Sequence, residues 1–168
     1  FYRCPLIPHM LSTEGPALAV ADINHDGLQD VFIGSSKWGK PGIFLQTTSA
    51  TFIKTNQPVL EKDSVYEDVD ACWADVNNDG NPDLIVASGG NEFYGNDINL
   101  SPRIYLNDGK GNLTKLGDAF NNLFVNASCI IPYDFNGDGK IDLFVGGRDL
   151  LGNYGQAPQA YWLKERSS

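Results

Sequence analysis

The sequence predicts an all-β chain that is built from repeated four-stranded antiparallel sheets. A nine-residue string, Asp-x-Asn-x-Asp-Gly-x-x-Asp, occurs three times, and short apolar runs lie on both sides of every copy. The copies begin at Asp22, Asp75 and Asp134, which gives spacings of 53 and 59 residues. A repeat of this length is typical of architectures in which each unit buries its apolar surface against the next unit.

The first two strands of each unit are expected on either side of the string. The apolar runs before it are 17–21, 71–74 and 129–131, and those after it are 31–33, 84–86 and 143–145. Such short apolar runs between turn residues are typical of β-strands. Because these runs do not alternate with polar residues, we expect the inner strands to be buried on both faces.

The outer strands follow in the same order in each unit. Third strands are expected at 43–46, 104–107 and 160–163, and fourth strands at 51–54 and 112–115. Asp108-Gly109 is a strong hairpin signal between two of them. The acidic segment 56–69 is expected to connect two units and can include a short helical turn. Four-stranded meanders that repeat at roughly 40–60 residues are typical of β-propeller blades.

We therefore interpret residues 1–168 as a segment of a β-propeller. The expected parts are a lead-in (1–14), two blades (15–56 and 57–117) and an incomplete third blade (118–168) that lacks a fourth strand. Three blades are too few to close the usual ring of roughly four to eight. We expect the remaining blades of a larger propeller, or self-association, to cover the terminal blades, and a self-contained three-unit domain is the alternative.

The repeated string concentrates oxygen ligands around a glycine, as a calcium ion requires. Positions 1, 3 and 5 offer side-chain oxygens, position 7 a backbone carbonyl and position 9 a carboxylate, while the glycine at position 6 allows a tight turn. The predicted ligands are Asp22, Asn24, Asp26, Leu28 and Asp30 in the first loop, Asp75, Asn77, Asp79, Asn81 and Asp83 in the second, and Asp134, Asn136, Asp138, Lys140 and Asp142 in the third.

Neither an EF-hand nor a magnesium site fits the string and its flanks as well as calcium in a β-turn does. An EF-hand needs a glutamate at position 12 and helices on both sides, whereas position 12 is Ile33, Val86 or Val145 and the flanks are strand-like. Magnesium demands a stricter octahedral geometry than these loops suggest. An ordinary Asn/Asp/Gly hairpin turn without metal remains the simple alternative.

The overall charge fits metal loops better than a nucleic-acid-binding surface. The net charge is −9, and the three loops alone contain nine aspartates. About three bound Ca²⁺ ions would bring the total to about −3. The chain has no basic stripe that would suggest nucleic-acid binding, and no apolar run approaches the roughly 18 residues of a membrane span.

The cysteines and histidines do not suggest another chemical site. Cys4, Cys72 and Cys129 show no zinc or redox spacing. Cys72 and Cys129 share strand parity, so they fit either a disulfide or a pair of buried thiols. His9 and His25 are isolated in the sequence, and His25 is expected to face solvent from a variable loop position.

The three loops and their strands resemble FG-GAP/VCBS repeats, the calcium-loop blades also found in the integrin α-subunit propeller. Further phrases are similar to extracellular bacterial VCBS-repeat proteins that often carry an ASPIC/UnbV-type domain. These phrases are 9–16, 87–92, 103–112 and 145–148. The resemblance implies a propeller of about seven blades, calcium between the first and second strands, and an exported or cell-surface location.

These features predict a calcium-binding extracellular scaffold that binds a protein or a carbohydrate and is not an enzyme. Calcium is expected to be structural. Binding is expected at the variable loops after the second strands, whose aromatic residues fit either ligand contact or packing between blades. The alternatives are a carbohydrate-active lyase or hydrolase, for which Glu92, Arg148 and Asp149 are the candidate groups, and a purely structural module. The variable loops expected to bind the ligand are 35–41, 89–97 and 147–155. The side chains singled out in them are Trp38, Phe93, Tyr94, Arg148 and Tyr154.

Overall fold

The computed structural model describes residues 16–117, 119–120, 122–150, 153 and 156–164. Within these residues, eleven strands form three antiparallel sheets, with one short α-helix and one 3₁₀ turn. The expected lead-in 1–14, Cys4, His9 and Tyr154 lie outside the described residues. The described part of the chain confirms the all-β propeller-segment prediction.

Each sheet is a meander in which neighbouring strands follow one another in the chain. The first two sheets have four strands, and three strands of the third are described. The first sheet contains β1 (Leu18–Ala21), β2 (Asp30–Ile33), β3 (Gly42–Gln46) and β4 (Phe52–Lys54); the second contains β5 (Asp68–Ala74), β6 (Asp83–Ser88), β7 (Arg103–Asn107) and β8 (Leu113–Leu116); the third contains β9 (Ala127–Tyr133), β10 (Asp142–Gly147) and β11 (Ala160–Leu163).

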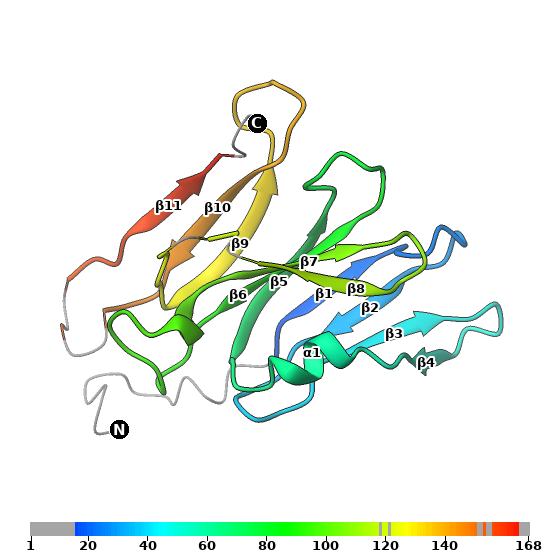
Figure 1. The fold of residues 1–168 in the computed structure, drawn as a ribbon, viewed down its shortest axis with the longest axis horizontal. Coiled ribbons are helices and arrows are strands. Elements are labelled where there is room, and N and C mark those ends of the chain that lie inside the picture. The colour runs from blue at the N-terminus through cyan, green and yellow to red at the C-terminus, as the bar shows by residue number, and fades with distance from the viewer. Residues whose placement is uncertain (1–15, 118, 121, 151–152, 154–155, 165–168) are drawn as a thin grey trace.

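The three sheets pack face to face, with the second sheet between the other two. Figure 1 shows this fan, in which β4 and β11 lie at opposite outer margins. Strand β5 contacts both β1 and β9, so the first strand of each sheet lies toward the common centre. One apolar cluster joins the first and second sheets around Phe32 and Leu84, and another joins the second and third around Ile85 and Val145.

Among the described inner strands, the prediction of burial on both faces holds in full only for β6 of the central sheet. All six residues of β6 are buried. In β1, by contrast, Leu18 and Val20 are 59% and 49% exposed, and Ile131 of β9 is 49% exposed. The first and third sheets are packed on one face within the described residues, so burial depends on a sheet's place in the stack as well as on its sequence.

The connection between the first two sheets includes the expected helical turn. Helix α1 (Pro58–Lys62) begins with a proline, whose fixed φ suits the first helical position. Leu60 is buried in the core. The side chain of Gln57 donates from Nε2 to the carbonyl of Gly111 at 2.7 Å. The connection is therefore fixed to the β7–β8 hairpin.

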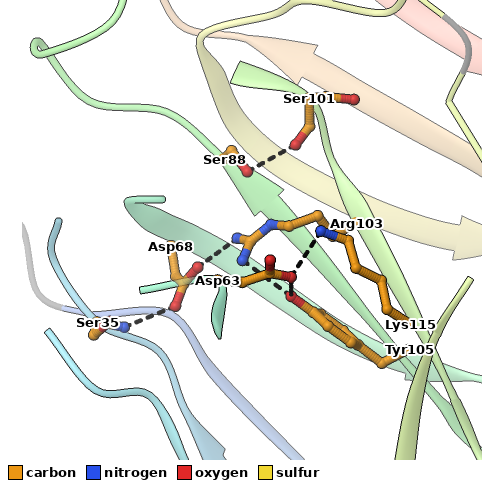
Figure 2. A network of polar contacts seen from close by, with 8 residues as sticks. All are labelled: Ser35, Asp63, Asp68, Ser88, Ser101, Arg103, Tyr105 and Lys115. Atoms are coloured by element: carbon orange, nitrogen blue, oxygen red, sulfur yellow. Dashed lines mark hydrogen bonds and ion pairs between the residues drawn. The ribbon is translucent and has the colours of Figure 1, made fainter. Parts of the chain in front are cut away.

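A buried ion pair lies within the second sheet, between β5 and β7, at the end of β5 that is remote from its Asp-rich loop. Arg103 donates from Nη2 to Asp68 Oδ1 at 2.5 Å, and both side chains are almost fully buried. The backbone N–H of Ser35, in the first unit, donates to Asp68 Oδ2 at 2.9 Å. Figure 2 shows these contacts. Asp68 thus joins two sheets while its charge is neutralised by Arg103.

The same network extends to the α1 connection. Arg103 Nη1 donates to the Tyr105 hydroxyl at 3.2 Å, and that hydroxyl donates to Asp63 Oδ2 at 2.6 Å. Lys115 Nζ lies 2.8 Å from the same Asp63 oxygen. Burial raises the pKa of Tyr105, so the phenol stays protonated and remains a donor. The positive charges of Arg103 and Lys115 therefore balance the negative charges of Asp68 and Asp63.

The two described cysteines are free thiols, Cys72 in β5 and Cys129 in β9. Burial raises the pKa of Cys72 to about 12, and the charge of Asp70 adds to this effect. A thiol with such a high pKa is protonated at neutral pH and unreactive. Sequence analysis left open a disulfide or a pair of thiols at these two positions. The described structure has the pair of thiols.

Candidate metal centre

The three Asp-rich loops connect the first and second strands of the three sheets, as predicted, and they share one backbone path. Position 4 of each string has a left-handed φ: 59° at His25, 58° at Asn78 and 77° at Gly137. The glycine at position 6 has φ of 82°, 86° or 83°. A Cβ on any of these three glycines would meet no other atom within 4 Å. The glycine is therefore required by backbone conformation and not by lack of space.

In the first loop, side-chain oxygens converge on backbone N–H groups. Asp22 Oδ1 and Asn24 Oδ1 both accept from the backbone N–H of Asp26 at 3.1 Å. Asp22 Oδ2 accepts from Gly27 at 2.8 Å. Asp26 Oδ1 in turn accepts from the N–H of Leu28 at 2.8 Å. The residues at positions 1, 3 and 5 therefore surround one small turn.

The second and third loops repeat this arrangement. Asp79 N–H donates to Asp75 Oδ1 and Asn77 Oδ1, both at 3.1 Å. Asp138 N–H donates to Asp134 Oδ1 at 3.2 Å and to Asn136 Oδ1 at 2.8 Å. The N–H groups of Asn81 and Lys140 donate to the carboxylate at position 5, as that of Leu28 does. The three predicted sites are thus equivalent in local structure.

The aspartate at position 9 is buried and ties its loop to the third strand. Asp30 accepts from the N–H of Ile23 at 3.2 Å and from that of Gln46, in β3, at 2.8 Å. Asp83 accepts in the same way from Val76 and from Asn107 of β7. For Asp142, the hydrogen bond within the described residues comes from Trp162 Nε1 at 3.4 Å.

Burial raises the pKa of Asp30. The N–H groups of Gln46 and Ile23 lower it in part, and the charges of Asp26 and Asp22 raise it further. Asp83 has the same balance: its pKa is raised by burial and by the charges of Asp79 and Asp75. The carboxylates of one loop therefore lie close enough to repel one another, which is the electrostatic condition that a bound cation relieves.

The donor set fits calcium. It consists of carboxylate, amide and backbone oxygens, the hard ligands that calcium prefers. Each ionised carboxylate oxygen that accepts one N–H keeps a second lone pair for a metal. Among the described residues, no three His, Cys, Asp or Glu side chains come together closely enough to hold a metal ion on their own. The aspartates point to backbone N–H groups instead, so the ligand set stays a prediction.

Neighbouring loops are also joined to each other. The Asn107 side chain donates from Nδ2 to the carbonyl of Ile23 at 2.8 Å and to that of Pro82 at 3.1 Å. His25 Nε2 lies 2.9 Å from Asn81 Oδ1. His25 is exposed, as expected, but it has a partner in the second loop. Sequence reasoning did not single out Asn107, although its position at the end of a third strand corresponds to that of Gln46.

The variable loops lie at the other end of the sheets and place their aromatic residues differently. Trp38 and Tyr94 are 71% and 66% exposed, whereas Phe93 is buried. Lys37 Nζ lies 4.4 Å from the centre of the Phe93 ring and 2.9 Å from Glu92. Phe93 and Glu92 therefore link two loops, whereas Trp38 and Tyr94 present most of their surface to solvent.

A groove of about 570 Å³ lies between the loops of the second and third sheets. Its described lining includes Tyr94 and Asp149, which the sequence singled out, but not Arg148. Four further lining residues were not predicted to take part in binding: Phe124, Asn126, Gln159 and Tyr161. No local pattern marks them, because they come from the segments before β9 and at β11.

Within the described residues, no helix has the length and apolar character needed to cross a membrane.

The comparisons with known proteins identify the repeat. A comparison with curated proteins gives no match. The FG-GAP-like repeat family matches residues 22–86 and again residues 75–145, so each match begins at the first aspartate of an Asp-rich loop. Together the two matches cover most of the chain, and we conclude that it belongs to the FG-GAP-like repeat family.

Proposed function

We propose that the protein is a calcium-stabilised, exported β-propeller scaffold whose variable loops bind a protein or carbohydrate ligand. One observation carries the calcium part: three loops far apart in sequence place the same oxygen-bearing residues around the same turn. Calcium would neutralise the aspartates and hold the first two strands of each sheet together. The predicted ligands at positions 1, 3, 5, 7 and 9 of each loop remain our assignment.

The calcium in this proposal is structural and does not contact the ligand. The Asp75–Asp83 loop precedes β6, and the variable loop follows it at Gly89. Six residues of strand span about 20 Å. A metal at one end of β6 therefore supports the scaffold, while the opposite end faces the ligand.

Two features support an exported protein made of further blades. Extracellular calcium is abundant enough to fill even weak sites, and the loop phrases resemble extracellular VCBS-repeat proteins of the ASPIC/UnbV-associated type. The outer faces of the first and third sheets expose Leu18, Val20, Ile131 and Trp162. In this proposal, further blades or a second copy cover these apolar faces.

Binding fits the groove better than hydrolysis does. Asp149 is the only acidic side chain among its described lining residues, whereas most glycosidases use two carboxyl groups. Neither Glu92 nor Arg148 is among the described lining residues of the groove, and Glu92 pairs with Lys37. We therefore assign no catalytic role to these residues.

Thermal unfolding with and without calcium tests this function. We expect the unfolding midpoint to rise with added Ca²⁺ and to fall with EGTA, because a ligand specific for the folded state stabilises it by about 2.7 kcal/mol per site at roughly 100-fold excess over Kd. Magnesium at the same concentration is the control and should have a smaller effect. A midpoint that is the same in Ca²⁺ and EGTA would contradict the proposal.

A further inference from the structure

We infer that the groove between the second and third sheets binds a neutral saccharide. This inference rests on the proposed binding function and gives it a place and a ligand class. The residues that carry it are the aromatic side chains Tyr94, Phe124 and Tyr161 and the polar side chains Asn126, Asp149 and Gln159, all of which line the groove.

The groove has the size of a small-molecule site, and its walls are joined to each other. Its volume of about 570 Å³ lies within the usual range for small-molecule pockets. The segments that form it are joined by backbone hydrogen bonds: Val125 N–H donates to the carbonyl of Leu100 at 3.3 Å, and Arg148 N–H donates to that of Asn126 at 2.8 Å. The walls are therefore held together before any ligand arrives.

Asn126 and Asp149 hold each other in place in the groove, whereas Gln159 and Tyr161 are paired in a solvent-exposed part of it. Asn126 is 7% exposed, and its Nδ2 donates to Asp149 Oδ1 at 2.5 Å. The Tyr161 hydroxyl donates to Gln159 Oε1 at 2.9 Å. Amide, hydroxyl and carboxylate groups bind the hydroxyl groups of a sugar as donors and acceptors, and fixed groups lose little entropy when they do so.

The aromatic side chains supply the apolar part of such a site. Tyr94 is 66% exposed in the variable loop, and Phe124 and Tyr161 line the same groove. A pyranose ring has an apolar face of C–H groups that packs on an aromatic ring, and its rim carries hydroxyl groups. The groove combines both kinds of surface, as small-molecule sites do.

The charge of the groove indicates a neutral saccharide and not an acidic one. The described lining contains one carboxylate, that of Asp149, and no lysine or arginine. A uronate or sulfate group would lie near this carboxylate without a cation to balance it, which is unfavourable. A ligand with hydroxyl groups alone has no such cost.

Ligand-observed NMR and calorimetry in calcium buffer test the inference directly. The probes are cellobiose, lactose, maltose and diacetylchitobiose, with trigalacturonate as the acidic comparison. We expect at least one neutral disaccharide to bind with Kd of about 1 mM or lower, and Tyr94→Ala to weaken that binding by at least about fivefold through loss of the stacking surface. The control is Phe52→Ala, which removes a half-exposed aromatic ring of β4 that lies outside the variable loops and outside the described lining of the groove and should leave affinity unchanged.

Three results would overturn the inference. They are no binding of any neutral probe up to about 10 mM, binding that Tyr94→Ala does not weaken, and tighter binding of trigalacturonate. Each can occur in a protein that calcium still stabilises, so each would remove the saccharide site and leave the scaffold function in place. Loss of the calcium effect in the melting experiment would instead contradict the scaffold function itself.

Discussion

The two ends of the central sheet handle charge in opposite ways. At one end, the buried Asp68 is neutralised by Arg103, and Asp63 is neutralised by Lys115 (Figure 2). At the other end, Asp75, Asp79 and Asp83 form no ion pair with a described residue and accept hydrogen bonds from backbone N–H groups instead. At the first end, basic side chains of the chain balance the negative charges. At the second end, the carboxylates keep an excess of negative charge that a bound cation would neutralise.

This difference gives a criterion that separates structural acidic clusters from candidate metal sites. Both ends contain aspartates beside a turn, so acidic residues alone do not distinguish them. The presence of a basic partner does. If the interpretation is correct, substitutions at the two ends should differ in whether their effects depend on calcium.

The largest effect on stability is expected at the end of the central sheet that carries the Arg103–Asp68 ion pair. Arg103→Leu should lower the free energy of unfolding by about 3–5 kcal/mol, because it leaves the buried Asp68 without its partner. The loss should be the same in Ca²⁺ and in EGTA, as measured by urea unfolding. Lys115→Met is the control, since Lys115 is partly exposed and its pair should contribute less than about 1 kcal/mol. A loss for Arg103→Leu that appears only in calcium would remove the distinction between the two ends.

An intermediate effect is expected at the end of the central sheet that carries the Asp75–Asp83 loop. Substitutions there should change calcium binding, and they should change stability only when calcium is present. Asp79→Ala should reduce the number of bound ions by about one per chain in calorimetric titration, because it removes a predicted carboxylate ligand. In EGTA its unfolding midpoint should stay close to that of the wild type. Asp108→Ala is a matched control, because Asp108 also accepts two backbone N–H groups in an exposed turn of the same sheet but lies outside the Asp-rich loops. Unchanged stoichiometry for Asp79→Ala would refute the ligand assignment.

The smallest effect concerns pH. Burial raises the pKa of Asp30 and of Asp83. The stability that each contributes is therefore present below its ordinary pKa and lost as the pH rises through the raised one. Calcium needs the ionised form, so the calcium-induced rise in melting temperature should be larger at about pH 7 than at about pH 4.5. Equal rises at the two pH values would show that these buried carboxyls are not linked to the metal.

Most of the fold was predictable because its signals are local. The Asp-rich strings fixed the turns, and the apolar runs beside them became β1, β2, β5, β6, β9 and β10, usually a few residues longer than predicted. The burial of β1 was not predictable. Its sequence resembles that of a fully buried strand, yet Leu18 and Val20 are exposed because their sheet lies at the end of the stack.

The candidate metal loops were predictable for the same reason, and the contacts between units were not. Asp22, Asn24 and Asp26 lie within five residues of one another, so their spacing is visible in the sequence. Asn107 reaches Ile23 across 84 residues, and Arg103 reaches Asp68 across 35. A single sequence carries no signal for such pairs, and they become apparent only when the sheets are stacked.

The side chain of Asn107 has a mechanical consequence. Its amide group is buried and joins a carbonyl in each of two successive Asp-rich turns, while its carbonyl oxygen accepts from Gly109 and Gly111. A displacement of either turn must break one of these bonds or carry the other turn with it. We therefore expect that a shift of one Asp-rich turn moves the neighbouring turn through the Asn107 amide.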